Sequence, residues 1–148
     1  MKTFNKTNFI ILGIIVLGIT VFTSCSKDKD TEPADADPAE YPTLIVGKWD
    51  IYTESYFQEN GSDSRVFMGK DEKSKMYEFT ENGKLKTETD PKGQPYSVSG
   101  RQLIAGEATY TITKLDKKKL VFEKIVGRNT EQGGKTGVLY GVYTGTKQ

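Results

Sequence analysis

Short runs in which apolar and polar residues alternate dominate the chain from residue 44 onward. A period of two residues is typical of a β-strand that has one buried face and one solvated face. Eight such runs can be identified, at 48–57, 64–69, 75–79, 84–89, 95–99, 108–113, 119–125 and 136–145. We find no convincing helical period in the same region. The pattern therefore predicts an all-β domain.

Turn residues between these runs predict that consecutive strands are antiparallel. Asn82-Gly83 is a two-residue turn sequence that favours positive φ and is the strongest short signal of a β-hairpin. The stretch 90–93, Asp-Pro-Lys-Gly, ends the strand that follows this hairpin. Eight sequential antiparallel strands can close into an up-and-down barrel, which removes exposed sheet edges. The predicted fold is an antiparallel eight-stranded up-and-down barrel over residues 44–148.

The alternation also predicts which side chains point into the barrel. On the last strand it assigns Val138, Tyr140 and Val142 to the inner face. Aromatic rings with a few polar tips are typical of a small-ligand pocket, but the same rings can simply fill a small barrel. Both readings stay open at this stage. The candidate ligand-binding residues are Tyr77, Phe79, Tyr96, Tyr110, Phe122 and Tyr140.

The first 24 residues have the pattern of a secretory signal peptide. Residues 1–8 are polar and contain two lysines, and an apolar run of 14 residues follows at 9–22. A membrane-spanning helix needs about 20 apolar residues, whereas a signal peptide has roughly 7–15. Thr23 and Ser24 are small, as a cleavage site requires, and Cys25 comes next. We predict a signal peptide at 1–24.

Residues 21–25, Val-Phe-Thr-Ser-Cys, resemble the lipobox of bacterial lipoproteins. The resemblance implies that Cys25 is lipidated on its thiol and, after cleavage, on its amino group. Two or three acyl chains would anchor the protein to a membrane effectively permanently. Ser26 resembles the residue found in lipoproteins sorted to the outer membrane, and Asp28 and Asp30 resemble surface-export signals that the intervening lysines weaken. The expected location is the outer membrane of the cell envelope, with its periplasmic and surface faces both open.

Residues 25–43 are polar, and they contain prolines at positions 33, 38 and 42. Such a segment cannot bury enough apolar surface to order itself, so it is predicted to be a flexible tether. The expected organisation is a signal peptide at 1–24, a lipidated cysteine and tether at 25–43, and a barrel domain at 44–148.

The start of the first predicted strand resembles that of a lipocalin-like domain, in which Gly-x-Trp opens the barrel. The matching residues here are Gly47 and Trp49. The segments 77–85, 110–115 and 120–123 resemble hairpins of small bacterial lipocalin-like lipoproteins. The resemblance implies an eight-stranded barrel that binds a hydrophobic ligand, with Trp49 closing one end. It also implies an arginine near the last strand that packs over this tryptophan, and Arg128, before that strand, is the candidate.

The composition argues against an enzyme. The chain has no histidine, which excludes the usual general base, the Ser-His and Cys-His nucleophile pairs and most transition-metal sites. Most carboxylates fall on predicted solvated faces or in loops, and no calcium-loop spacing is present. The formal net charge of +1 is far from the basic footprint of a nucleic-acid binder. We expect no catalysis, metal, cofactor or nucleic acid.

Two classes of function remain open. The first is a membrane-anchored barrel that binds a small apolar or amphipathic molecule among its inner aromatic residues. The second is a filled barrel whose polar loops, 58–74 and 127–136, bind an envelope protein or a glycan, because loops on rigid scaffolds commonly carry recognition. The family resemblance favours the first class, and the bulk of the inward aromatic residues favours the second.

Overall fold

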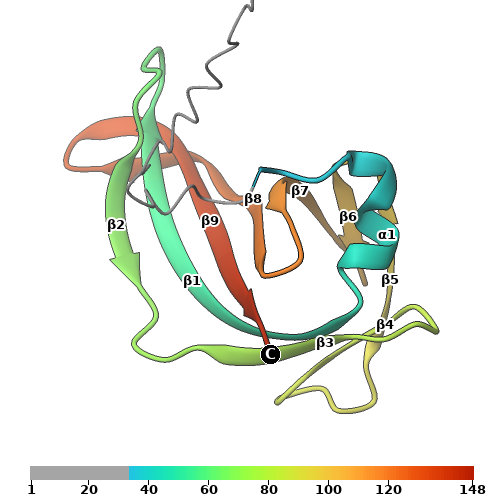
Figure 1. Cartoon of the computed structure of the whole chain (residues 1–148). Helices are drawn as coiled ribbons and strands as arrows, with labels where there is room; N and C mark the ends of the chain where they lie inside the picture. The colour runs from blue at the N-terminus through green and yellow to red at the C-terminus, as the bar shows by residue number, and fades with distance from the viewer. Residues whose placement is uncertain (1–33) are drawn as a thin grey trace, which may run out of the picture. The chain divides into compact units, whose positions relative to one another are not determined.

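The computed structural model describes residues 34–148 (Figure 1). The predicted signal peptide, Cys25 and the first part of the predicted tether lie outside the described residues. In 34–148, no helix is long and apolar enough to span a membrane.

The described chain consists of two short helical turns followed by nine strands. The 3₁₀-helix η1 spans Pro38–Glu40 and the helix α1 spans Tyr41–Leu44. The strands are β1 (Gly47–Glu59), β2 (Val66–Lys70), β3 (Lys75–Phe79), β4 (Lys84–Thr87), β5 (Gln94–Ser99), β6 (Gln102–Ala105), β7 (Ala108–Leu115), β8 (Lys119–Gln132) and β9 (Lys135–Lys147).

Eight of the strands close into an antiparallel barrel. Strands β3 to β9 follow one another in space as they do in sequence, and β1 joins β3 on one side and β9 on the other. The extra strand β2 pairs with the later half of β1, beside the position where β3 pairs with its first half. The predicted fold class, an all-β up-and-down barrel, is confirmed.

The eight barrel strands are not the eight that the pattern identified. The run at 64–69 forms β2, which lies outside the closed barrel, while β6 was not predicted. Strand β6 has only four residues, of which Leu103 and Ala105 are buried. Tight turns with glycines at positive φ flank it, Gly100 at 54° and Gly106 at 58°. Two alternations are too few to distinguish a strand from a loop by pattern.

The chain packs onto the barrel well before residue 44. Tyr41 and Ile45 are fully buried in the core. Asp35 accepts hydrogen bonds from the backbone N–H of Leu115 (2.8 Å), the Tyr41 hydroxyl (2.7 Å) and Arg101 (2.6 Å). The prediction of a flexible tether up to residue 43 is therefore wrong for residues 35–43. The few apolar residues of this polar segment are buried by the barrel, which a local pattern does not reveal.

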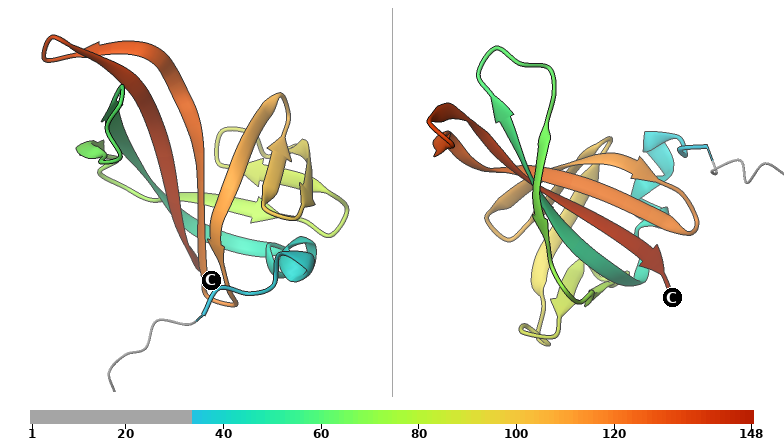
Figure 2. Two further views of the ribbon diagram at one scale, coloured as in Figure 1. Left: turned by 90° about the horizontal axis from the view of Figure 1, so that it is seen from above. Right: turned by 90° about the vertical axis from the view of Figure 1, so that its left-hand side faces the viewer.

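The core fills the barrel from the end at which β1 starts. This end, which we call the closed end, also holds α1 and the β7–β8 turn (Figures 1 and 2). Most of the buried apolar residues form one cluster, which consists of Tyr41, Ile45, Trp49, Ile51, Phe79, Leu85, Leu103, Ala105, Ile112, Leu115, Leu120 and Phe122.

The inner face of β9 is offset by one residue from the prediction. Ile51, which is buried, lies opposite Gly145, and directly opposed residues share a face of the sheet. A Cβ atom on Gly145 would lie 3.1 Å from Ile51, so this glycine faces inward. Tyr143 packs against the core from the same face. The assignment of Tyr140 and its even-numbered neighbours to the interior is therefore wrong, because glycines on the inner face conceal the alternation.

Candidate functional site

Three strands of the barrel, β1, β8 and β9, continue past the end opposite the closed end and form a curved extension. It contains the later half of β1, the end of β8 and the start of β9, together with β2, which pairs with β1 (Figures 1 and 2). We call its concave face, together with the mouth of the barrel, the cup. The cup residues are Thr53, Ser55, Phe57, Val66, Met68, Lys124, Val126, Leu139 and Tyr143, with Tyr77 and Tyr110 at the mouth.

Strand register places the apolar cup residues on one face. Phe57 continues the inner face of β1 and lies opposite Val66 of β2. Val126 of β8 reaches the same side, since a Cβ atom on the inward Gly141 would lie 3.0 Å from its Cγ2. Val66, Met68 and Val126 remain 61%, 43% and 56% exposed. The cup therefore presents apolar side chains to solvent.

A cavity of about 370 Å³ lies in the cup beside β2. Its walls are both polar and apolar. The lining residues are Thr53, Ser55, Met68, Gly69, Lys70, Asp71, Gln132 and Leu139. The volume falls in the range of roughly 300–1,000 Å³ that small-molecule sites occupy.

Three tyrosines converge at the mouth of the barrel. The Tyr110 and Tyr143 rings meet edge to face at 5.5 Å, and Tyr143 stacks on Phe122 at 4.8 Å. Burial, together with the nearby Tyr110, Tyr77 and Asp71, raises the pKa of Tyr143 to about 12. Burial and Tyr110 also raise the pKa of Tyr77. The phenols of Tyr77 and Tyr143 therefore stay protonated at neutral pH and can donate hydrogen bonds.

Lys124 places a cation at the mouth of the barrel. It lies opposite the inward Gly141, and its ammonium group is 5.1 Å from the centre of the Tyr110 ring. No carboxylate within 34–148 forms an ion pair with it. By contrast, the second lysine of the mouth, Lys75, is paired with Asp71 at 2.9 Å. Lys124 thus gives the mouth an uncompensated positive charge.

The predicted ligand-binding residues separate into three groups. Phe79, Tyr96 and Phe122 fill the barrel: the first two meet edge to face at 5.1 Å, and the Tyr96 hydroxyl donates to the Thr80 carbonyl at 3.0 Å. Tyr110 packs on Phe122 at 5.2 Å and reaches the mouth, as does Tyr77. The aromatic side chains placed deepest thus serve as core.

Tyr140, the sixth candidate, lies on the outer face of the extension. The Arg65 guanidinium stacks 3.7 Å above its ring. The same guanidinium forms a bidentate ion pair with Glu123 at 2.6 and 3.1 Å. Tyr140 is therefore part of an outer clamp that joins β8, β9 and the segment before β2, and it is not a cup residue.

Gly47 and Trp49, the two residues of the Gly-x-Trp pattern, lie at the closed end. Trp49 is fully buried and donates its indole N–H to the Ile45 carbonyl at 2.7 Å. The cation over its ring is Lys147, at 5.1 Å, whereas Arg128 is exposed in β8. Gly47 has φ 133°, and a Cβ atom there would lie 2.8 Å from Cε of Lys147. The Lys147 side chain could move aside, so it is the positive φ, which other residues rarely adopt, that favours glycine at this position.

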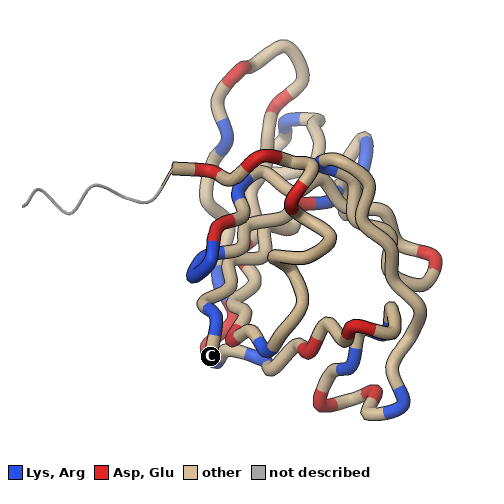
Figure 3. Tube along the Cα trace, turned by 45° about the vertical axis from the view of Figure 1, so that its right-hand side comes forward, with Lys and Arg blue, Asp and Glu red and all other residues tan. Residues whose placement is uncertain are grey.

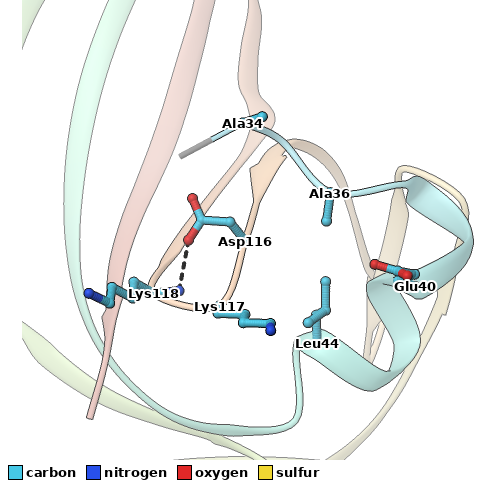
Figure 4. A pocket seen from close by; sticks show the side chains of 7 residues that line it. All are labelled: Ala34, Ala36, Glu40, Leu44, Asp116, Lys117 and Lys118. Carbon is cyan, nitrogen blue, oxygen red and sulfur yellow. Dashed lines mark hydrogen bonds between the residues drawn. The ribbon is translucent and has the colours of Figure 1, made fainter. Parts of the chain in front are cut away.

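A second cavity, of about 390 Å³, lies at the closed end between α1 and the β7–β8 turn (Figure 4). Leu44 and Ala36 form its apolar wall, opposite Asp116. Asp116 Oδ1 accepts from the backbone N–H groups of Lys118 and Lys119 at 2.7 and 2.9 Å, while Oδ2 is buried without a partner. This carboxylate shapes the turn, and its buried oxygen is not accessible from the cavity.

Of the two segments predicted to be recognition loops, 127–136 is mostly strand and 58–74 is strand in part. Residues 58–74 include the end of β1 and all of β2, and 127–136 include the end of β8 and the start of β9. Their low apolar content suggested loops, but pairing along β1 and β9 holds them in the extended sheet. These segments form the walls of the cup.

No family model, curated protein or solved structure matches this chain. Acidic and basic residues are interspersed over the described domain (Figure 3). Within residues 34–148, no group of three Cys, Asp or Glu side chains is arranged to hold a metal ion. The function is therefore inferred from the geometry of the cup.

Proposed function

We propose that this protein is a membrane-tethered binding module that holds a small anionic amphipathic molecule in the cup. Exposed apolar side chains on one concave face carry the proposal: Val66, Met68 and Val126 lie on the same face as the half-buried Leu139. Contiguous apolar exposure on a soluble domain commonly marks a binding site. The apolar part of the ligand would lie along these residues and exclude water from them.

The mouth of the barrel supplies the polar recognition. Lys124 has no carboxylate partner among the described residues, and the protonated phenols of Tyr77 and Tyr143 lie nearby. A carboxylate, sulfonate or phosphate on the ligand would accept hydrogen bonds from these groups and compensate the lysine charge. This arrangement favours an anionic head over a cationic one.

The resemblance to lipocalin-like lipoproteins agrees with this proposal, although the site lies above the barrel core and not within it. We further propose that Cys25 carries the lipid anchor in the outer membrane and that the protein has no catalytic activity. Mass spectrometry of the membrane-extracted protein should find an acylated cysteine at its N-terminus. Recovery of an unmodified, soluble product from cells would contradict the anchoring proposal.

Binding can be tested with a soluble form that begins at Ser26. We expect the fluorescent probe 1-anilinonaphthalene-8-sulfonate to bind, and dodecanoate to displace it at lower concentration than dodecyltrimethylammonium. Lys124→Gln should remove most of this preference for the anion. An equal response to both detergent-like probes in the unmodified protein would contradict the assignment of the head group.

Two neighbouring residues offer a matched pair of variants. Val126 faces the cup, whereas Ile125 lies opposite the outward Tyr140, and both are exposed. Val126→Glu should weaken probe binding by about ten-fold or more, since it places a charge against the apolar part of the ligand. Ile125→Glu should change binding by less than about two-fold. Equal effects of the two variants would place binding elsewhere.

The filled barrel supports a second candidate, a module that binds an envelope protein or a glycan. In that case, no small molecule would co-purify with the protein, because a macromolecule would cover the cup in the membrane. Native mass spectrometry of the protein extracted from its membrane distinguishes the two candidates.

A further inference from the structure

The described chain begins at the closed end of the barrel and is fixed there by hydrogen bonds. The backbone N–H of Ala36 donates to the Leu115 carbonyl at 3.0 Å, and Asp35 accepts from the backbone N–H of Leu115 at 2.8 Å. Ala34 comes nine residues after Cys25, so even a fully extended chain spans no more than about 30 Å between them. A lipid anchor on Cys25 therefore keeps the closed end within this distance of the membrane.

Exposed cations lie beside this point of entry. The β7–β8 turn brings Lys117 and Lys118 to the closed-end cavity, which Ala34 also lines (Figure 4). Both lysines are exposed, and no carboxylate within residues 34–148 forms an ion pair with either of them. Asp116, the acidic residue of the turn, is buried, and its carboxylate accepts from the backbone N–H of Lys118 at 2.7 Å. The turn is thus held in a conformation that leaves both lysine side chains in solvent.

The same cavity adds an apolar surface to these charges. Leu44 and Ala36 form its apolar wall, and Leu44 is only half-buried. The cavity has a volume of about 390 Å³. Glu40 also lines it and offsets part of the positive charge. Cations beside an apolar surface match the two parts of an anionic phospholipid, its phosphate and the acyl chains next to it.

We propose that the closed end is a docking surface for an anionic phospholipid bilayer, with Lys117 and Lys118 against the lipid phosphates and Leu44 facing the acyl chains. The inference rests on the proposed anchoring through Cys25, and it does not depend on the ligand of the cup. Anchoring makes docking an intramolecular event, so weak contacts are sufficient. Each lysine close to an anionic bilayer favours the docked orientation by roughly five-fold.

Docking at the closed end would fix the direction in which the cup opens. Strand β1 starts at the closed end, and its later half forms part of the extension that bears the cup (Figures 1 and 2). The cup lies beyond the opposite end of the barrel. It would therefore open away from the anchoring bilayer, where a ligand can enter from the aqueous phase.

Fluorescence quenching in vesicles tests this orientation. The lipidated protein is labelled with a fluorescent maleimide at Thr43→Cys, in α1, or at Glu107→Cys, in the exposed turn at the far end of β7. The vesicles contain a lipid with a nitroxide quencher on its head group. Exchanging part of the phosphatidylcholine for phosphatidylglycerol should raise the ratio of quenching at residue 43 to that at residue 107 by about three-fold or more. The tether alone also brings residue 43 near the bilayer, but its effect does not depend on lipid charge.

The same labelling separates a failure of docking from a failure of anchoring. Cys25 is the only cysteine of the chain, so lipidation leaves no free thiol in the protein without an introduced cysteine. If that protein reacts with the maleimide, anchoring through Cys25 is contradicted, and the docking inference with it. If it does not react and the quenching ratio ignores lipid charge, docking alone is contradicted.

Two pairs of lysines provide matched variants. Lys117→Gln combined with Lys118→Gln should abolish the increase that phosphatidylglycerol causes. Lys73→Gln combined with Lys92→Gln removes the same charge from two exposed loops, β2–β3 and β4–β5, and should preserve the increase. The proposal is overturned if the ratio in the unmodified protein does not respond to phosphatidylglycerol, or if both pairs of changes reduce the response equally.

Discussion

The closed end and the cup are built on the same strands but differ in how far their apolar side chains are exposed to solvent. At the closed end, Tyr41, Ile45 and Trp49 are completely buried. In the cup, Val66 and Val126 are more than half exposed. Strand β1 passes through both regions, from Trp49 at the closed end to Phe57 in the extension.

The difference lies in what covers each end. Residues 35–45 close one end, and the buried indole N–H and phenol O–H groups there find the Ile45 carbonyl and Asp35 as acceptors. Nothing within residues 34–148 covers the other end in this way. Burial supplies most folding free energy, so the closed end should dominate stability and the cup should contribute mainly to binding.

The largest expected effect is at Trp49. Trp49→Ala should lower the free energy of unfolding by about 3–5 kcal/mol, because it leaves a large cavity in the core. Val126→Ala should cost less than about 1 kcal/mol, since little burial is lost. Urea denaturation followed by circular dichroism measures both values. Similar costs at the two sites would remove the distinction between the two ends.

The second-largest effect on stability is expected at the glycines on the inner face of β9. A Cβ atom on Gly137 would clash with the Gln58 carbonyl and lie 2.7 Å from the Phe57 ring. Gly137→Ala should therefore lower the free energy of unfolding by about 1–3 kcal/mol. Gly69→Ala, in open space, should change it by less than about 0.5 kcal/mol. Thermal unfolding should show a lower Tm for the first variant alone.

Acid should weaken the attachment of residues 35–45. Burial acts to raise the pKa of Asp35, but hydrogen bonds from Leu115, Tyr41 and Arg101 hold it below the ordinary 3.8. The folded state thus binds the proton less tightly than the unfolded state. The resulting stability is present above pH 3.8 and is lost as pH falls through the folded pKa.

Asp35→Asn provides the measurement. At pH 7 the variant should be less stable than the unmodified protein, and the gap should shrink towards pH 2–3, by about 1–2 kcal/mol in all. Asp63→Asn, at an exposed carboxylate without a described partner, is the control. A gap that stays constant with pH would mean that the Asp35 charge does not stabilise the closed end.

The smallest effect is expected at the mouth of the barrel. The pKa of Tyr143 is about 12, above its ordinary 10.0, so the unfolded state ionises first and stability falls as pH rises above 10. Tyr143→Phe should leave stability at pH 7 within about 0.5 kcal/mol and reduce this alkaline loss. In absorbance at 295 nm, the variant should lack one late-titrating phenol. An unchanged titration would contradict burial of Tyr143.

The sequence by itself determined that the domain is an antiparallel β-barrel, and it identified much of the core. Alternation over 77–79 and 108–113, with the Asn82-Gly83 turn, specifies strands and hairpins through local geometry alone. Phe79 and Ile112 are buried as their positions on those strands predict. Local pattern is sufficient here because each apolar residue alternates with a polar one.

Tertiary structure decided where the barrel closes and where the cup lies. On β9 the inward positions include Gly137, Gly141 and Gly145, so the buried face carries no hydrophobic signal and Tyr140 was assigned to the wrong side. Whether Val126 faces solvent or core depends on how far β8 extends past its partner β7. The burial of Tyr41 depends on contacts with strands more than 50 residues away. Such long-range contacts form only in the packed barrel, so the alternation of neighbouring residues does not predict them.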